Sequence, residues 1–285
     1  MTNKPIDRPP QEPPPDLIFR RRLSPAQAMR ELWEAREMVR SLAERAFRIR
    51  YKQAVLGFAW AILTPLALML VFTVVVARVV EIDTGGVPYP LFAYLGLLPW
   101  TFFSTSVTLG GNSLVANVPL LNKIYCPREV FPLASITVAI VDTLIASVVL
   151  AALFVVFGYV PSVMSIWVPL LTLVLLMFTV GVILFTSIVM VYLRDLRHTV
   201  PILLQVGLFA TPVAYGIGLL PERFLALYSF FNPLVAVIDG YRGTILLGIP
   251  PDWNLLVPGA AGALTSLLLG IWIFKRLEGG IADVA

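Results

Sequence analysis

Few side chains in this sequence could perform acid–base, nucleophilic or metal chemistry, and they do not cluster. The 285 residues include one cysteine, Cys126, and one histidine, His198. One cysteine cannot form an internal disulfide, and these two residues alone cannot supply a zinc or haem site. The sequence also has no G-x-x-x-x-G-K-[ST] phosphate-binding loop and no D-x-D pair. We therefore expect no catalytic residue, no metal site and no cofactor in this chain.

Asp142 is the one acid deep inside an apolar stretch. Ionisable groups within a membrane are costly and usually face protein or water. A proton-coupling carboxylate is one interpretation, but proton relays need several partners. The only Lys or Arg in the expected spans is Arg78, near an outer end. We interpret Asp142 as a structural acid, hydrogen-bonded to a neighbouring helix or near an aqueous path.

The elements that must position these residues are apolar helices. Hydrophobic residues make up 58% of the chain and charged residues 13%, and a helix needs about 20 apolar residues to cross a bilayer. The pattern predicts an all-α polytopic membrane protein with six transmembrane helices. Their expected positions are about 54–79, 91–111, 131–157, 165–193, 200–220 and 254–274.

The segment 221–251 is apolar but interrupted by Asn232 and Pro233. It predicts short re-entrant or outer helices between spans 5 and 6, because such pieces are tolerated where protein or a water-filled cavity covers their ends. Asp239 and Arg242 are three residues apart there and could pair on one helical face.

The positive charges predict the orientation. Of the 21 Lys and Arg, twelve precede Gln53, and two each fall in the second loop, in the fourth loop and after the last span. Short loops rich in Lys and Arg stay in the cytoplasm, so we expect both termini to be cytoplasmic. The basic pI of about 9.3 then follows from orientation, and nucleic-acid binding is not needed to explain it.

Two further segments precede the expected transmembrane domain at 53–285. Residues 1–19 form a proline-rich tail that we expect to be disordered. Residues 20–52 predict a cytoplasmic amphipathic helix, begun by Ser24 and Pro25 and rich in arginine, lying in the membrane interface. The alternative is a plain soluble helix or a coiled-coil arm.

Four segments together resemble a known family. They are RIRYKQAVLGFAWAILTP (48–65), NKIYCPREVFPLA (122–134), YLRDLRH (192–198) and FNPLVAVIDGYRGTILLG (231–248). In this order they resemble the permease subunit of bacterial ABC exporters for polysaccharides and polyol phosphates, which include O-antigen, teichoic acid and capsule exporters. The resemblance runs from about Arg30 to the C-terminus.

The resemblance implies a homodimer in the bacterial cytoplasmic (inner) membrane. Two copies of a separate cytoplasmic ABC ATPase subunit would hold ATP and Mg²⁺. The implied substrate is a lipid-linked polysaccharide, carried on a long polyprenyl diphosphate. This chain would then be a permease and not an enzyme.

The resemblance also implies site residues. The ATPase-coupling loop would comprise Asn122, Lys123, Tyr125, Pro127, Arg128 and Glu129. The channel would be lined by Trp60 and Tyr215, and the outer gate would include Asn232, Pro233, Asp239, Tyr241 and Arg242. One departure is Cys126, where relatives usually carry an aromatic residue such as Phe.

Cations at the mouth of the first span support a further hypothesis, a substrate entrance that attracts a diphosphate. Its residues are Arg48, Arg50, Tyr51 and Lys52. Three alternatives stay open: an ABC-type permease of the same fold for a drug or small lipid, a membrane enzyme of lipid-linked sugar metabolism, and an ion-driven secondary transporter that would depend on Asp142.

Overall fold

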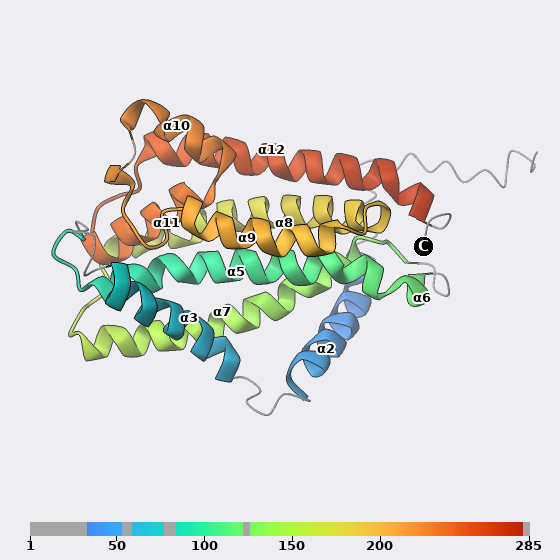
Figure 1. Cartoon of the computed structure of the whole chain (residues 1–285), viewed down its shortest axis with the longest axis horizontal. Helices are drawn as coiled ribbons and strands as arrows, with labels where there is room; N and C mark the ends of the chain where they lie inside the picture. The colour runs from blue at the N-terminus through green and yellow to red at the C-terminus, as the bar shows by residue number, and fades with distance from the viewer. Residues whose placement is uncertain (1–32, 53–58, 77–83, 122–125, 220, 282–285) are drawn as a thin grey trace, which may run out of the picture.

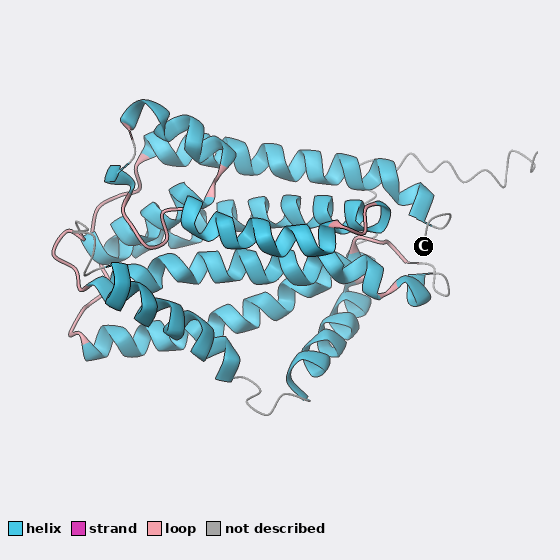
Figure 2. Ribbon diagram, in the orientation of Figure 1, coloured by secondary structure: helices cyan, strands magenta, loops and turns pink. Residues whose placement is uncertain are grey.

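Helices make up the regular structure of this chain. A computed structural model describes all residues except 1–32, 53–58, 77–83, 122–125, 220 and 282–285. Within the described residues there are helices and loops and no strand (Figure 2). The all-α prediction is therefore confirmed for this part of the chain.

Four long apolar helices form the centre of the molecule. They are α5 (Tyr89–Ala116), α7 (Val130–Val156), α8 (Val168–Tyr192) and α12 (Trp253–Leu277). Helix α5 packs against both α7 and α8, and α12 packs along α8 (Figure 1). Each is long and apolar enough to cross a membrane, and their bounds lie close to the second, third, fourth and sixth predicted spans. Local composition sets these bounds, because a lipid-facing segment must satisfy its backbone hydrogen bonds within one helix.

Glycines let α8 and α12 approach closely. A side-chain Cβ built on Gly181 would lie 2.5 Å from the carbonyl of Ser266, and Gly270 faces Gly181 from the other helix. Small residues at such crossings allow backbone-to-backbone contact, which stabilises helix pairs where the surrounding lipid provides no hydrophobic driving force. The close distance between α8 and α12 therefore depends on Gly181 and Gly270, which have no side chain.

The remaining apolar helices are shorter. Helix α3 (Ala59–Val71) continues into a π turn (Phe72–Val76), and α9 covers Leu196–Ala210. Helices α10 (Glu222–Phe231) and α11 (Leu234–Tyr241), the latter extended by a π turn (Arg242–Leu247), meet at a bend of 111°. The described residues thus hold four helices that could span a membrane, or five if the bent pair is one span. The count of six spans stays a prediction.

The predicted fifth span is wrong at its C-terminal end. The prediction extends it over 200–220, but α9 ends at Ala210. Pro212 disfavours helical backbone at the preceding residue, and Thr211 is extended with ψ 141°. With 15 residues, α9 is about 22 Å long, which is shorter than the hydrocarbon core.

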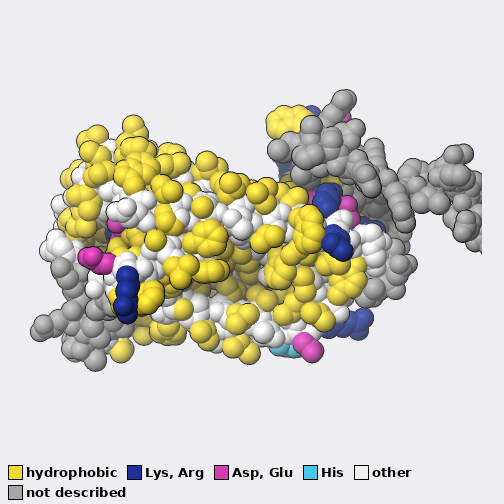
Figure 3. All heavy atoms as spheres, turned by 90° about the horizontal axis from the view of Figure 1, so that it is seen from above, with side chains coloured by type: hydrophobic (Ala, Val, Ile, Leu, Met, Phe, Trp, Pro, Cys, Tyr) yellow, Lys and Arg dark blue, Asp and Glu magenta, His cyan; other side chains and the backbone are white. Residues whose placement is uncertain are grey.

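The arginine-rich helix is present as α2 (Arg36–Lys52), which leans against α7 (Figure 1). Its predicted start at Ser24, and the proline-rich tail, lie outside the described residues. Apolar side chains cover most of the face seen in Figure 3, and the charged side chains drawn there gather toward its two ends. This distribution agrees with a surface that faces lipid in its middle.

Candidate functional site

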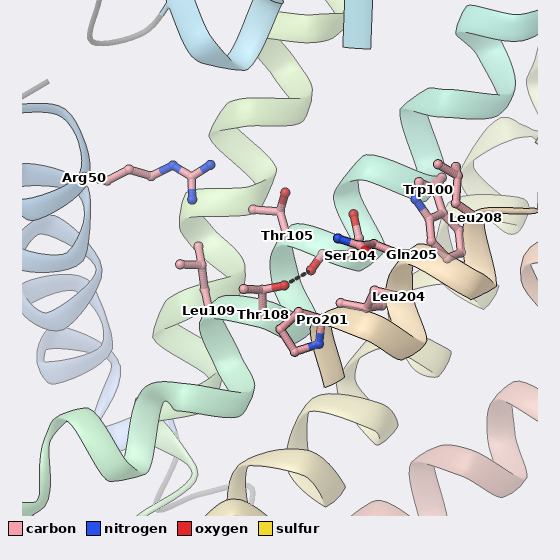
Figure 4. A pocket seen from close by; sticks show the side chains of 10 residues that line it. All are labelled: Arg50, Trp100, Ser104, Thr105, Thr108, Leu109, Pro201, Leu204, Gln205 and Leu208. Atoms are coloured by element: carbon pink, nitrogen blue, oxygen red, sulfur yellow. Dashed lines mark hydrogen bonds between the residues drawn. The ribbon is translucent and has the colours of Figure 1, made fainter. Parts of the chain in front are cut away.

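A groove runs between α5 and α9, on one side of the helix bundle. Its volume is about 350 Å³. Helix α5 contributes Trp100, Ser104, Thr105, Thr108 and Leu109, and α9 contributes Pro201, Leu204, Gln205 and Leu208. Figure 4 shows these side chains, with Arg50 reaching toward the groove from α2.

The groove combines polar and apolar side chains and has no acidic one. The Ser104 hydroxyl donates to the Thr101 carbonyl at 3.3 Å, and the Thr108 hydroxyl donates to the Ser104 carbonyl at 2.7 Å. Each hydroxyl oxygen keeps lone pairs that can accept from a ligand. The lining has no Asp, Glu, Cys or His, and the described residues hold no cluster of such groups that could bind a metal ion. The hydroxyl and amide groups of the groove can therefore hold hydrated polar groups.

A second cavity of about 480 Å³ lies beneath α2, between α5 and α7. Arg45 and Arg50 of α2 line it together with polar side chains of α5, among them Asn112, Ser113 and Asn117. Arg50 lines this cavity and the α5–α9 groove. Its side chain is therefore shared by the two spaces.

Asp142 is bonded to α2. Its Oδ2 lies 2.9 Å from Nη2 of Arg50, and its Oδ1 accepts a hydrogen bond from the Tyr51 hydroxyl. Burial and the hydrogen bond to Asp142 raise the pKa of Tyr51 to about 12, so this phenol stays protonated and donates. The expected hydrogen bond from a neighbouring helix to Asp142 is confirmed, and its structural role stays an interpretation. Sequence reasoning missed its partners, because 91 residues separate Tyr51 from Asp142.

The other predicted entrance residues contribute differently. Arg48 is exposed and forms an ion pair with Glu44 at 3.6 Å along the same helix. The Lys52 side chain lies outside what the structure describes. The structure thus brings Arg50 and Tyr51 together on one carboxylate and leaves Arg48 on another face.

The predicted coupling loop is described in part. Asn122, Lys123 and Tyr125 lie outside the described residues, and Pro127, Arg128 and Glu129 lead into α7. The Cys126 thiol is half-buried, and burial raises its pKa. The described part of the loop is therefore joined directly to a long helix.

Glu129 points inward, to the end of α12. Its Oε1 forms an ion pair with Nζ of Lys275, which also lies 3.3 Å from Oε2 of Glu278. The Tyr192 hydroxyl donates to the Leu277 carbonyl at 2.7 Å. These bonds tie the first residues of α7 and the end of α8 to the end of α12. Sequence reasoning missed Lys275, since only the tertiary structure brings the start of α7 to the end of α12.

The two predicted channel residues are both accessible. Trp60 is exposed on α3, and the Tyr215 hydroxyl donates to the Phe209 carbonyl at 3.0 Å. That bond anchors Tyr215 to the end of α9 while its ring stays partly exposed. No contact in the described structure tests a channel role for either residue, which stays a prediction.

Arg242 is buried, and its side chain holds the segment that follows α9 by hydrogen bonds. Its guanidinium donates to the carbonyls of Phe92 at 3.1 Å, Pro212 at 2.7 Å and Tyr215 at 3.0 Å, and also to Val213. It lies 3.6 Å from the centre of the Phe92 ring. Within the described structure Arg242 forms no salt bridge with Asp239, although the two charges lie close enough to attract each other, so the expected direct pairing is wrong. The guanidinium is therefore occupied by the carbonyl of Phe92 in α5 and by three carbonyls of the segment that follows α9.

The other predicted gate residues are packed into the same region. Asn232 donates to the Thr211 hydroxyl at 2.9 Å, and Pro233 immediately precedes α11. The hydroxyls of Tyr241 and Thr172 are 2.7 Å apart. The bent α10–α11 pair is thus fastened to both α9 and α8, and its role as a gate stays a prediction.

Comparison with known proteins identifies relatives along most of the chain. Residues 37–246 match the family described as ABC-2 type transporter. The chain is 30% identical over 256 residues to the O-antigen export system permease protein RfbA of Myxococcus xanthus, covering 90% of this chain and 98% of that protein. It is 26% identical over 244 residues to the protein of the same name from Klebsiella pneumoniae, covering 85% and 93%. It is 26% identical over 253 residues to the polysialic acid transport protein KpsM of Escherichia coli, covering 84% and 93%.

Proposed function

The chain belongs to the ABC-2 type transporter family, and from this premise we propose that it is the membrane subunit of an ATP-driven exporter of a lipid-linked polysaccharide. The observation that carries the proposal is the acid-free groove between α5 and α9. Hydroxyl and amide side chains can exchange hydrogen bonds with sugar hydroxyls. The relatives named for O-antigen export and polysialic acid transport support a polymer as the cargo.

In this proposal two copies of the chain face each other across the substrate path. The groove is open to one side in a single chain, and a second copy would close it. Each copy carries six spans, with α3 and α9 beside the path. Trp60 and Tyr215 line it, and the α10–α11 region gates its outer end.

The energy comes from a separate subunit. A cytoplasmic ATPase, present in two copies, binds ATP and Mg²⁺ and docks on the loop that ends in Pro127, Arg128 and Glu129. The end of the molecule that carries α6 (Val118–Leu121) and the C-terminal end of α12 faces the cytoplasm (Figure 1). The protein then lies in the inner membrane of a bacterium.

Two measurements test this function. The chain is expressed with the product of its neighbouring ATPase gene, and their co-purification and ATP hydrolysis are followed in wild type, Arg128→Ala and Glu129→Ala. In a strain lacking the chain, surface polysaccharide should disappear and lipid-linked polymer should accumulate inside. Surface polysaccharide that persists unchanged, or the absence of any associated ATPase, would refute the exporter.

The groove is tested by a matched pair of substitutions. Thr108 and Thr265 both donate to the carbonyl four residues earlier, at 2.7 and 2.8 Å, but only Thr108 lines the groove. Thr108→Val should reduce export while ATPase association is retained, and Thr265→Val should leave export unchanged. Equal export in the two variants would show that the groove hydroxyl does not contact the substrate.

A further inference from the structure

Two neighbouring donors on the last turn of α2 converge on one carboxylate. Arg50 bonds one oxygen of Asp142 at 2.9 Å and Tyr51 bonds the other. The Arg50 side chain is 36% exposed and the Asp142 side chain is 12% exposed. The ion pair is therefore reachable from the Arg50 side, while Asp142 is largely enclosed by protein.

The surroundings of Arg50 favour an anion. Arg50 lines the cavity beneath α2 and the α5–α9 groove, and neither lining contains an Asp or a Glu. Arg45 adds a second cation to the cavity beneath α2. Asp142 is the carboxylate that pairs with Arg50 within the described structure. A negatively charged group in either space can therefore reach this arginine.

We propose that Asp142 occupies the place of a substrate anion and that the diphosphate of a lipid-linked substrate displaces it from Arg50. The inference rests on the proposed function and deepens it, by naming the group that the entrance recognises. Phosphate oxygens accept from a guanidinium in the same bidentate geometry as a carboxylate and carry more charge. The Tyr51–Asp142 hydrogen bond can persist during the exchange, so α2 stays attached to α7.

If the Arg50–Asp142 ion pair were purely structural, the effect of neutralising Asp142 on anion binding would be the opposite. If Asp142 only fastens α2 to α7, neutralising it loosens the helix and weakens or leaves unchanged any anion binding. If Asp142 competes with the substrate, neutralising it frees Arg50 and strengthens binding. The apparent dissociation constant rises in inverse proportion to the fraction of protein in which the site is free. For a partly exposed ion pair that leaves Arg50 free in about one molecule in five, Asp142→Asn should bind about fivefold more tightly.

The test measures binding of radiolabelled farnesyl diphosphate to the permease–ATPase complex in phosphatidylcholine nanodiscs. Excess MgADP fills the nucleotide sites of the ATPase. The variants are Asp142→Asn, whose amide oxygen still accepts from Tyr51, and Arg50→Gln. The matched control is Arg40→Gln, which removes an arginine of the same helix that pairs with Glu44 at 3.2 Å. Asp142→Thr replaces Asp142→Asn if the asparagine variant does not fold.

The expected order is tighter binding for the Asp142 variant, at least tenfold weaker binding for Arg50→Gln, and wild-type binding for Arg40→Gln. An Asp142 variant that binds no more tightly than wild type overturns the proposal, as does Arg50→Gln with wild-type affinity. Farnesol that binds as well as farnesyl diphosphate would also overturn it, because the alcohol lacks the anion. If the variants bind inorganic pyrophosphate in the same order of affinity, the anion site is supported. The result would also show that a free phosphate anion, without the lipid, is enough for binding.

Failure here is distinguishable from failure of the proposed function. Export and ATPase association are measured in the same variants. A wild-type complex that assembles and exports but whose Asp142 variant gains no affinity refutes only the anion exchange. A wild-type chain that recruits no ATPase refutes the exporter itself.

Discussion

Replacing Lys275 with methionine removes the cation that joins the end of α12 to the start of α7. Methionine keeps a similar length and leaves the Glu129 and Glu278 carboxylates facing each other without it. The Glu129 side chain is only 9% exposed and the Lys275 side chain 29% exposed, so solvent screens this pair little. The substitution should therefore cost measurable stability.

The magnitude follows from burial. Removing one partner of a buried ion pair costs about 3–5 kcal/mol, but Lys275 is partly exposed and is shared with Glu278. We expect a loss of about 2 kcal/mol, within the range of a hydrogen bond to a charged group. The melting temperature should then fall by about 4–8 °C.

The assay is a double-mutant cycle on the purified permease. The free energy of unfolding, from SDS titration in mixed micelles, is measured for wild type, Lys275→Met, Glu129→Gln and the double variant. The coupling energy should be about 1–2 kcal/mol, and Lys275→Arg should restore most of the stability. The control is Arg276→Met, whose arginine lies over the Trp272 ring at 5.2 Å. Effects of the two single variants that add to within about 0.5 kcal/mol would refute the pairing.

Three further predictions address the packing, the gate region and the thiol. Gly181→Ala places a Cβ 2.5 Å from the Ser266 carbonyl, so α8 and α12 must separate. The free energy of unfolding should therefore fall by about 1–3 kcal/mol. The control Gly279→Ala, whose added Cβ would have nothing within 4 Å, should leave the free energy of unfolding unchanged. Arg242→Lys should lower the free energy of unfolding by about 2–3 kcal/mol, because one ammonium cannot reach all the carbonyls that the guanidinium binds. A variant as stable as wild type would contradict the assigned hydrogen bonds. Because burial raises the pKa of Cys126, less thiolate is present at a given pH, and N-ethylmaleimide should label it more slowly than a cysteine peptide at pH 8. A pH–rate midpoint at or below the ordinary thiol value would contradict this direction.

Local sequence is enough to locate the long helices and to recognise the family. Apolar length and turn residues place α5, α7, α8 and α12 close to their observed bounds, because helix formation in lipid depends on local composition. The segments 122–134 and 192–198 lie within the region that matches the ABC-2 type transporter family. Such motifs can be recognised without knowing which helices touch, so family membership follows from the order of residues along the chain.

The pairing of the polar groups depends instead on how the helices pack. Asp142 pairs with Arg50, Lys275 pairs with Glu129, and Arg242 binds carbonyls of α5 and of the segment after α9. In each case the two partners are distant in sequence. A charged side chain buried among helices must find an opposite charge or a free carbonyl, and helix packing sets which one is within reach. Composition can therefore predict that Asp142 needs a partner on a neighbouring helix, but only the contact of α2 with α7 identifies Arg50 and Tyr51.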